Sequence, residues 1–565
     1  AEMTRFSTEL KAYAGRWIAL GEDRVVVSAG DAEQSVRRRA EAARPDENLS
    51  ILWVSPSAPY VAMPAWPLSM IRRVAADRCI WLAGGPVRDL LLGRPPQDWD
   101  FVVVQDGLAL ARKVANTLGG AYYPLDAKRG TGRVIIRRSQ PNAYRYQPLS
   151  LLREDEGLRK RKEVTLDFAE LRAPDIRADL AARDFTVNAM ALTLEGRLID
   201  PTGGEADLAA GRLRLTHPDA FRDDPARLLR AIRQTHQFAL EITPDTRDQL
   251  QDDARLITEV APERVRDELV KLMTHATVSQ ALQDMKTLGL LPYVLPALAH
   301  LAAEPSTSPQ SYPTGWDHIR ATVTTTVEAL YWLSDRPLPT AEPTSPAWMW
   351  NALTTELACQ REPLQAYMDA AVSGLTRADL LPWAALMDSI PESVEDQMKA
   401  LRFSNRAIRF VKLVLAGPEI FEELVANPLT GVASHARTVT RRDTYRYFQA
   451  TGDAGVGAIL LALMGTAAKR VRLPSREAWE HRLKVAHALL TSYFQHHEEV
   501  IEPKPLLGGH ALLRMGVPSG PEIGRILAEL TEEQAAGEIT TEVEARAHVR
   551  RLLSQTASDG RGTTL

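Results

Sequence analysis

The chain has 565 residues, of which 45% are hydrophobic and 25% are charged, and its formal net charge is −4. This length exceeds what one hydrophobic core serves and predicts about three to five domains, while the composition excludes a disordered or fibrous chain. The small net charge leaves nucleic acid open as a partner only through a local basic surface. Two cysteines exclude a disulfide scaffold, and no apolar run reaches about 18 residues, so the sequence predicts a cytoplasmic protein without a membrane span.

Residues 1–66 are predicted to form a small α/β appendage with a linker. The pattern indicates strands at 17–20 and 24–27, a helix over 31–43 and a third strand at 51–54, followed by a Pro-rich linker at 55–67. This unit is similar to a short domain family with no assigned chemistry. It contains no catalytic grouping of residues.

Residues 67–203 alternate strands and helices and are predicted to form a head domain. A strand at 80–83 runs into Gly84 and Gly85, a helix follows, and Asp98 begins the next strand. Further strands are predicted at 121–125, 132–137 and 164–169. The long polar segment 138–163, which ends in four basic residues, is predicted as a surface loop. Its charge fits RNA contact, with a solvated insertion as the alternative.

From residue 204 onward the periodicity is almost entirely helical. We divide this part into a neck (204–300), a body (301–500) and a C-terminal tail (501–565), with breaks rich in Pro, Ser and Thr at 304–315 and 335–346. The predicted fold class is therefore α+β: a mixed sheet with helices, followed by a long all-α region and preceded by the small α/β unit.

The glycine pair and two aspartates form the clearest chemical signal in the sequence. Side chains at i and i+2 of a strand share a face, so Asp98 and Asp100 converge and suit divalent cations. Gly84 and Gly85 allow a phosphate to approach backbone N–H groups at a helix N-terminus. Asp167, on a later strand, is the candidate third acid. An isolated pair of this kind is more often a solvated strand edge, but its context here favours a nucleoside triphosphate site with Mg²⁺ for phosphoryl or nucleotidyl transfer.

Five motifs in order resemble those of the class II tRNA nucleotidyltransferase and bacterial poly(A) polymerase family. They are residues 81–93 (WLAGGPVRDLLLG) with 98–100 (DWD), 183–190 (RDFTVNAM), 200–208 (DPTGGEADL), 223–233 (DDPARLLRAIR) and 261–269 (APERVRDEL). Residues 516–524 (GVPSGPEIG) resemble the tail motif of longer members. The resemblance is strong over about 75–300 and weak over 315–555, and it implies a polymerase-β-like head.

The resemblance also implies roles for the first motif. Asp98 and Asp100 would bind Mg²⁺ and catalyse attack of an RNA 3′-hydroxyl on the α-phosphorus, with Asp167 assisting. Gly84 and Gly85 would lie against the β- and γ-phosphates. Arg88, one turn into the helix, would add positive charge there.

The later motifs would select the sugar and the base. Asp184 and Asn188, four apart on one helical face, would hold both ribose hydroxyls, with Arg183 as a phosphate ligand. Asp224 and Arg227, three apart on the next helix, would recognise the edges of C and A without a nucleic-acid template. Arg230 and Arg233 continue this stripe and would support Asp224 or contact the RNA acceptor strand. A capped helix and an ordinary i,i+3 salt bridge are the structural alternatives for these two segments.

One residue limits the resemblance in the body. Many long relatives carry a phosphohydrolase domain with a His…His-Asp…Asp metal cage, and His318 matches its first position, but Met387 precedes Asp388 where a ligand His is expected. We therefore read 316–495 as a degenerate HD-like domain kept for packing and RNA contact. Basic clusters that would bind the tRNA backbone, or else form solvated helix faces, are Arg409 with Lys412, Arg437 with Arg441 and Arg442, and Lys469 and Arg470 with Arg472.

The function predicted from the sequence is template-independent addition or repair of the 3′-terminal CCA of tRNA with CTP and ATP. A Gly-Arg-Arg-Phe segment typical of bacterial poly(A) polymerases is missing after the paired aspartates, where residues 118–123 read LGGAYY. The stretch 170–182, which corresponds to a flexible loop of the family, is short and contains Pro174. A specialist that adds only CC or only A, or a general RNA 3′-tailing enzyme, is therefore the near alternative. A non-catalytic RNA-binding protein and a phosphohydrolase acting through the body are the distant ones.

Overall fold

The computed structural model describes residues 10–559 except 22–24, 46, 48, 57–60, 77, 95, 97, 138–162, 304–314, 339–342, 427–438 and 470–472. The predicted loop at 138–163 thus lies outside the described residues apart from Glu163, as do Arg437, Arg470 and Arg472, residues 304–314 of the first Pro-rich break and residues 339–342 of the second. Two units account for the contacts of the chain, Ala1–Val260 and Ala261–Leu565. Each is described by itself.

The N-terminal appendage is a four-stranded antiparallel sheet with one helix. Its elements are β1 (Trp17–Leu20), β2 (Val26–Gly30), α2 (Glu33–Ala43), β3 (Ser50–Val54) and β4 (Ala62–Pro64), in the order β2-β1-β3-β4. Val36 and Ala40 of α2 pack against Ala19 and Ile51 on one face of the sheet. The predicted ββαβ order is confirmed, but the stretch predicted as a linker contains β4 and the start of α3 (Ala65–Ala75).

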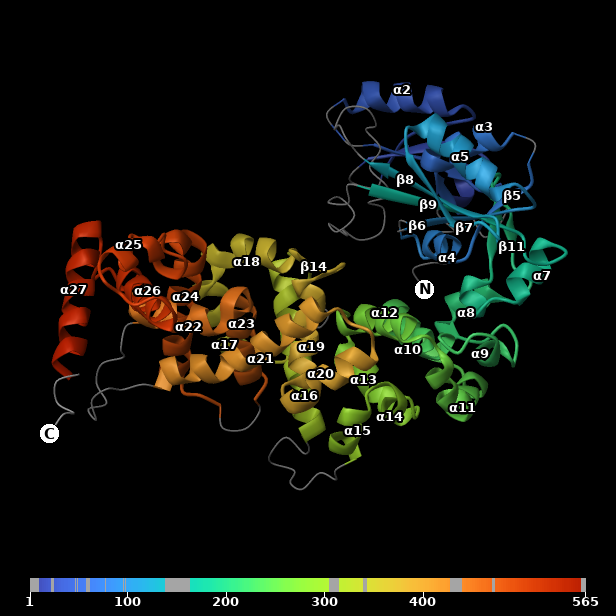
Figure 1. Cartoon of the computed structure of the whole chain (residues 1–565). Coiled ribbons are helices and arrows are strands. Elements are labelled where there is room, and N and C mark those ends of the chain that lie inside the picture. Colours follow the sequence, from blue (N-terminus) through green and yellow to red (C-terminus); the bar gives the residue numbers. More distant parts are fainter. Residues whose placement is uncertain are drawn as a thin grey trace. The chain divides into compact units, whose positions relative to one another are not determined.

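The head contains a seven-stranded mixed sheet in the order β11-β10-β5-β6-β9-β8-β7. The strands are β5 (Ile80–Ala83), β6 (Asp98–Val103), β7 (Ala121–Asp126), β8 (Thr131–Arg137), β9 (Glu163–Glu170), β10 (Ala191–Thr193) and β11 (Leu198–Ile199). Only β6 and β9 pair in parallel. Helix α5 (Gly107–Leu118) packs across β8 and β9 (Figure 1). Buried Phe101 and Phe168 stack between the central strands at 5.1 Å, and the predicted mixed α+β head is confirmed.

The other helices of the first unit lie between and after the strands of this sheet. They are α4 (Gly85–Leu91) within the head, then α7 (Ile176–Ala181), the 3₁₀ helix η2 (Thr186–Asn188), α8 (Gly204–Ala209), α9 (Ala220–Asp223), α10 (Arg227–Phe238), α11 (Pro244–Asp253) and η3 (Ala254–Glu259). Two short strands, β12 (Arg212–Leu213) and β13 (Glu241–Ile242), pair in parallel here. These two strands lie within the region after residue 204 that the sequence predicts as almost entirely helical, and periodicity does not reveal them because each is only two residues long.

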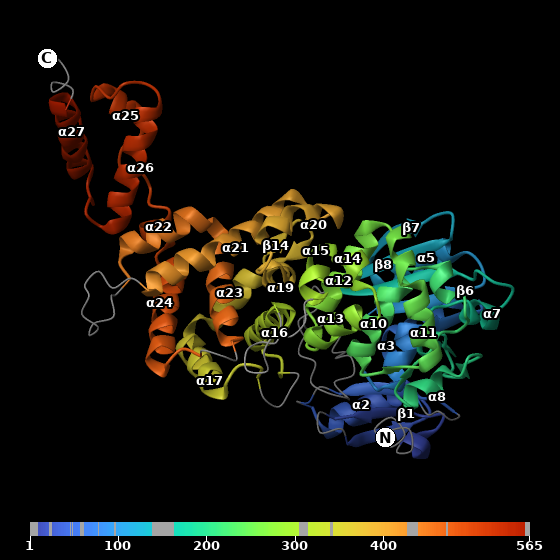
Figure 2. The same ribbon diagram turned by 90° about the horizontal axis from the view of Figure 1, so that it is seen from below.

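The second unit is helical, as predicted. Its helices of eight residues or more are α12 (Pro262–Met273), α13 (Val278–Thr287), α15 (Pro296–Ala303), α16 (Gly315–Leu333), α17 (Ala347–Glu356), α18 (Arg361–Met368), α19 (Arg377–Met387), α21 (Asn405–Ala426), α22 (Arg441–Thr451), α23 (Gly455–Ala467), α24 (Arg476–Gln495), α26 (Pro521–Ala536) and α27 (Glu542–Asp559). The shorter elements are α14 (Leu291–Val294), α20 (Val394–Ala400), α25 (Gly509–Arg514), the single turns η4 (Ala358–Gln360), η5 (Pro391–Ser393), η6 (Gly452–Ala454) and η7 (His497–Ile501), and the hairpin strands β14 (Ala371–Val372) and β15 (Leu375–Thr376). Helix α23 is almost wholly buried and packs on α16, α19 and α21 (Figure 2).

One stretch of the described chain, Arg441–Ala467, is long and apolar enough to cross a membrane by composition. It comprises α22 and α23, and 78% of its apolar window is buried within the protein. Burial of this extent is typical of a core helix in a globular protein, and it fits the packing of α23.

Met387, the last residue of α19, is also fully buried. Across the described residues, no three or more His, Cys, Asp or Glu side chains gather as metal ligands.

Candidate active site

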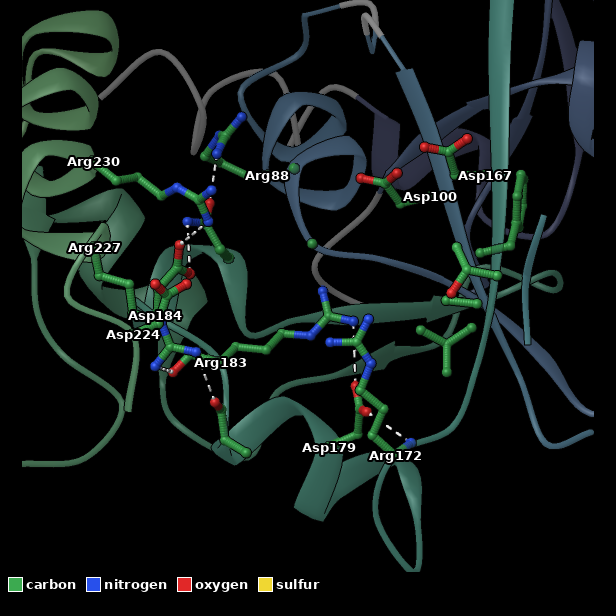
Figure 3. A pocket seen from close by; sticks show the side chains of 18 of the residues that line it. Arg88, Asp100, Asp167, Arg172, Asp179, Arg183, Asp184, Asp224, Arg227 and Arg230 are labelled. Atoms are coloured by element: carbon green, nitrogen blue, oxygen red, sulfur yellow. Dashed lines mark hydrogen bonds and ion pairs between the residues drawn. The ribbon is translucent and has the colours of Figure 1, made fainter. Parts of the chain in front are cut away.

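A pocket of about 600 Å³ lies within the first unit, a size typical of small-ligand sites. It is lined by the ends of β6 and β9, the start of α4, residues 172–188 and one side of α10 (Figure 3). All the site residues predicted from the sequence line this pocket except Asp98. The structure therefore brings together side chains that are up to 149 residues apart, from Gly84 to Arg233.

The paired aspartates share one face of β6. Asp98 and Asp100 are exposed while Trp99 and Phe101 are buried, which is the alternation expected of a strand with one buried side. The parallel register of β6 and β9 sets Asp100 directly beside Asp167. Although Asp100 keeps exposed surface, loss of water around its carboxylate and then the negative charges of Asp167 and Asp98 raise its pKa to about 6. This concentration of negative charge suits a cation.

An arginine missed by the sequence analysis holds the third acid. Arg133 of β8 lies opposite Asp167 in the antiparallel register of β8 and β9. Its Nε and Nη2 donate to the two carboxylate oxygens of Asp167 at 2.8 and 2.7 Å. Both oxygens of Asp167 thus already have a charged partner. The residues that best fit a divalent cation are Asp98 and Asp100, whose oxygens are the ligand type that Mg²⁺ prefers.

The backbone of Gly84 makes room for an arginine. Gly84 has φ +79°, and a Cβ built on it would lie 2.7 Å from Nη1 of Arg183. The same guanidinium donates through Nη2 to Asp179 at 3.3 Å, and its charge partly offsets the rise in the pKa of Asp100. The Gly84 carbonyl accepts from the N–H groups of Val87 and Arg88 and starts α4. Arg183 therefore lies between the glycine turn and the acids, as a residue that faces both.

Arg88 is a buried side chain with protein partners. Its Nε and Nη2 donate to Asp89, its Nη1 donates to Oδ1 of Asn188 at 2.5 Å, and its guanidinium lies 3.7 Å from the ring centre of Phe238. Burial lowers the pKa of this guanidinium, chiefly through loss of water. Arg88 thus donates to Asn188 and pairs with Asp89, whereas the sequence predicts that it adds positive charge beside the phosphates.

Asp184 and Asn188 meet directly, although they do not share an α-helix as predicted. Asp184 precedes the 3₁₀ turn η2, and Asn188 ends it. Nδ2 of Asn188 donates to Oδ1 of Asp184 at 3.1 Å and to Oε1 of Gln234 at 2.9 Å. Arg230 donates to the other oxygen of Asp184 at 3.2 Å. The sequence analysis missed Gln234 and expected Arg230 beside Asp224 or the RNA.

Asp224 and Arg227 also line the pocket but from two sides of a helix break. Asp224 follows α9 in an extended conformation, with φ −151° and ψ 95°, and its carboxylate accepts from the N–H of Ala226 at 3.3 Å. Arg227 is the first residue of α10 and donates to the carbonyls of Arg183 and Ala220 at 3.3 and 3.1 Å. The prediction that both lie on one helix is wrong, because Pro225 disfavours the helical conformation of the residue before it.

The segment between β9 and η2 is tied at both ends by one acid. Oδ1 of buried Asp179 accepts from the N–H of Arg172 at 3.2 Å, and Oδ2 accepts from Arg183. Asp175 caps α7 by accepting from the N–H of Ala178. Arg172 and Asp179 line the pocket and were also missed from the sequence. The Asp175 cap three residues before Ala178 is a local signal that predicts α7.

Two family profiles match the parts of the chain that build and follow this pocket. Residues 80–214 match the poly(A) polymerase head domain, and residues 239–301 match the probable RNA- and SrmB-binding site of polymerase A. Residues 8–57 match a family of unknown function, which confirms the resemblance found for the appendage.

Relatives match over most of the length of this chain. The CC-adding tRNA nucleotidyltransferase of Geobacter sulfurreducens is 28% identical over 83% of this chain and 91% of its own length. The A-adding tRNA nucleotidyltransferase of Deinococcus radiodurans is 30% identical over 84% of this chain and 96% of its own length. A solved structure of a CCA-adding enzyme with ATP has the same fold, with a TM-score of 0.55, 20% identity and coverage of 86% and 94% of the two chains. The chain is a nucleotidyltransferase that belongs to the class II tRNA nucleotidyltransferase and poly(A) polymerase family.

Proposed function

We propose that this protein adds or repairs the 3′-terminal CCA of tRNA with CTP and ATP, without a nucleic-acid template. The observation that supports this proposal is that Asp100, the pair Asp184 and Asn188 and the pair Asp224 and Arg227 all line one pocket, with Asp98 beside Asp100 on the same face of β6. The RNA 3′-hydroxyl attacks the α-phosphorus, the bond from that phosphorus to the β-phosphate oxygen breaks, and pyrophosphate leaves.

The acids of β6 act on the reacting phosphate. Asp98 and Asp100 are the residues that would hold Mg²⁺, which supplies positive charge to the triphosphate and to the attacking oxygen. Asp167, fixed by Arg133, adds negative charge beside Asp100. Gly84 and Gly85 let the phosphates approach the start of α4, and Arg183 contributes its charge from beside Gly84.

The pocket wall formed by η2 and α10 selects a ribonucleotide. Asp184 and Asn188 present carbonyl and carboxylate oxygens to the two ribose hydroxyls. A deoxyribonucleotide lacks the 2′-hydroxyl, so it forms one hydrogen bond fewer to these oxygens, which costs about 1–3 kcal/mol.

Asp224 and Arg227 read the base. The Asp224 carboxylate accepts from the exocyclic amine that both C and A carry, and the Arg227 guanidinium donates to the ring nitrogen and, for C, to O2. U and G present a carbonyl oxygen where Asp224 requires a donor. Arg230 and Arg233 then face the acceptor end of the RNA. Arg233 also donates to Gln237 at 2.7 Å.

A specialist that adds only CC or only A is the second candidate. The relatives that match most of the chain include both kinds, and Asp179 ties the short segment before η2 at both ends. Such a tie restrains the movement that a switch from C to A requires. General RNA 3′-tailing is a further alternative for the reaction. For the body, we propose a degenerate HD-like domain, because Met387 stands where the metal cage requires a His ligand.

Contact with tRNA outside the pocket is proposed for the basic helix faces of the second unit. Several of their cations already have partners: Lys412 with Glu395, Arg441 with Glu499 and Arg442 with Glu533. The first two pairs are exposed and weak, so an RNA phosphate can replace the carboxylate in them. Contact with tRNA at these faces therefore requires that the basic side chains exchange a carboxylate partner for an RNA phosphate.

Labelled CTP or ATP, supplied to tRNAs that lack the last three, two or one nucleotides, tests the proposal. Full CCA activity predicts that CTP extends the first two and ATP the third, while a specialist extends a subset. No incorporation into any of the three, with retained binding to tRNA, would instead support a non-catalytic RNA-binding protein. Ring opening of a 2′,3′-cyclic phosphate to a phosphomonoester, or release of phosphate from a phosphomonoester, with Ni²⁺ or Mn²⁺ would support a phosphohydrolase.

A further inference from the structure

We propose that Gln234 is a positioning residue for sugar selection, acting through Asn188. This inference rests on the proposed function, because it assigns a residue to the ribose-binding wall of the same pocket. Gln234 lies on α10 and lines the pocket, but its side chain is almost wholly buried, with 4% of the residue exposed. A buried amide in this position requires hydrogen-bond partners.

The partners of Asn188 fix which way its amide faces. Oδ1 of Asn188 accepts from Arg88, and its Nδ2 donates to Asp184 and to Gln234. If the amide were turned over, Nδ2 would face the Arg88 donor and Oδ1 would face two acceptor oxygens. Arg88 can only donate and the Asp184 carboxylate can only accept, so these two partners fix one orientation, and Oε1 of Gln234 adds a second acceptor for Nδ2.

This orientation determines what the ribose meets. With both N–H groups of Asn188 committed to Asp184 and Gln234, Asn188 can offer the sugar only its Oδ1, as an acceptor. Asp184 is likewise an acceptor, held by Asn188 and by Arg230. The wall is therefore built to accept hydrogen bonds from hydroxyl groups, and a sugar that lacks one hydroxyl leaves an acceptor unmatched.

Loss of Gln234 removes one anchor and leaves the rest of the pocket in place. In Gln234→Leu an apolar side chain of similar size preserves packing and helix propensity, but Nδ2 of Asn188 loses an acceptor, so one of its N–H groups becomes available to the sugar beside the Oδ1 acceptor. We expect the preference for a ribonucleotide over its deoxyribonucleotide to fall about 3- to 10-fold. Gln234→Glu keeps the acceptor oxygen and is expected to restore most of the preference.

The matched control is Gln237→Leu. Gln237 is the same residue type on the same helix and accepts from Arg233, but it does not line the pocket. Gln237 is only partly buried, so this control asks whether loss of any amide on α10 changes the preference; if it did, both leucine variants would change the preference alike. The inference predicts that Gln237→Leu leaves the ratio at the wild-type value.

The preference is measured in two ways for wild type and the three variants. One is the ratio of kcat/KM for CTP and dCTP, or ATP and dATP, during addition to truncated tRNA. The other is the ratio of equilibrium dissociation constants by calorimetry, which does not require turnover. A lower ratio in Gln234→Leu alone, with recovery in Gln234→Glu, supports the inference.

The two proposals fail separately in this experiment. A Gln234→Leu protein that folds as wild type and keeps the wild-type ratio overturns the inference, as does a wild type that binds both sugars equally. A wild type that adds nothing to tRNA, but whose binding preference depends on Gln234, overturns the proposed function and leaves the inference standing.

Discussion

Arg133 donates to both carboxylate oxygens of Asp167, at 2.8 and 2.7 Å, immediately beside Asp100 on the adjoining strand. Three acids, Asp98, Asp100 and Asp167, lie within electrostatic reach of one another, and Arg133 is the cation that compensates the third of them. The ion pair therefore both orients Asp167 and limits the repulsion that a nucleotide meets on entry.

Removal of this ion pair should impair catalysis. In Arg133→Gln the Asp167 carboxylate loses its charged partner and its orientation, so we expect kcat/KM for nucleotide addition to fall about 10-fold, the equivalent of ~1.4 kcal/mol. The matched control is Arg137→Gln. Arg137 lies on the same strand and pairs with Glu163, but its side chain is 81% exposed, so its loss should change activity less than about 2-fold. Equal effects of the two variants would refute a specific role for Arg133.

The pKa of Asp100 predicts a pH-dependent stability of the metal-free protein. Its folded-state pKa of about 6 exceeds the ordinary value of 3.8, so between these values the folded state keeps a proton that the unfolded state loses. The free energy of unfolding therefore falls as pH rises through this window. Asp100→Asn should raise the melting temperature at pH 7.5 but hardly at pH 4.5, with a gain of about 1 kcal/mol once solvent screening of the exposed side chain is considered.

Thermal melts in a chelator at both pH values measure this effect. Asp248→Asn, on an exposed turn of α11, serves as the control and should show no pH-dependent gain. A gain for Asp100→Asn that is the same at pH 4.5 and 7.5 would contradict the raised pKa.

Gly84 should be more sensitive to a methyl group than another glycine with positive φ. Gly84→Ala introduces a Cβ 2.7 Å from Arg183 in addition to the strain of φ +79°, so Arg183 must move and activity should fall at least about 10-fold. Gly119, at the end of α5, has φ +67°, but nothing lies within 4 Å of the position that a methyl group would take there. Gly119→Ala should therefore cost about 1 kcal/mol of stability and no activity, and an active Gly84→Ala protein would show that Arg183 needs no such space.

Asp224 should control the choice of base. Asn at this position both donates and accepts, so Asp224→Asn should tolerate the carbonyl of U, and the preference for CTP over UTP should fall about 10-fold or more. The neighbouring Asp223→Asn, which changes an exposed acid near His217, should leave the preference unchanged. Competition between labelled CTP and UTP on truncated tRNA measures this ratio. An unaltered preference in Asp224→Asn would remove Asp224 from base selection.

The local features of the site could be predicted from the sequence, because they depend on spacing along one element. The i, i+2 spacing on β6 gives the shared face of Asp98 and Asp100, and the strand-to-glycine transition gives the turn at Gly84. Pro225 also indicates that Asp224 lies outside the helix, whereas the spacing of Asp224 and Arg227 taken alone predicts that both share one.

The remaining contacts depend on tertiary structure. Arg133 reaches Asp167 through strand register, and Gln234 reaches Asn188 across 46 residues of chain. The segment after Asp184 is not an α-helix because the N–H of Thr186 donates to the carbonyl of Arg214 and that of Phe185 to the Asp184 carboxylate. The distant bonds of Thr186 and Gln234 override local propensity, and one sequence holds no pattern that specifies them.

The most direct test of the central claim is single-turnover transfer of labelled CMP or AMP to truncated tRNA by wild type and by Asp100→Asn. Asn preserves the shape of the side chain and removes the charge that gathers cations beside the α-phosphate. We predict extension of the RNA by wild type and a loss of at least about 1,000-fold in the variant, with tRNA binding unchanged. Extension at the wild-type rate by Asp100→Asn would contradict the account.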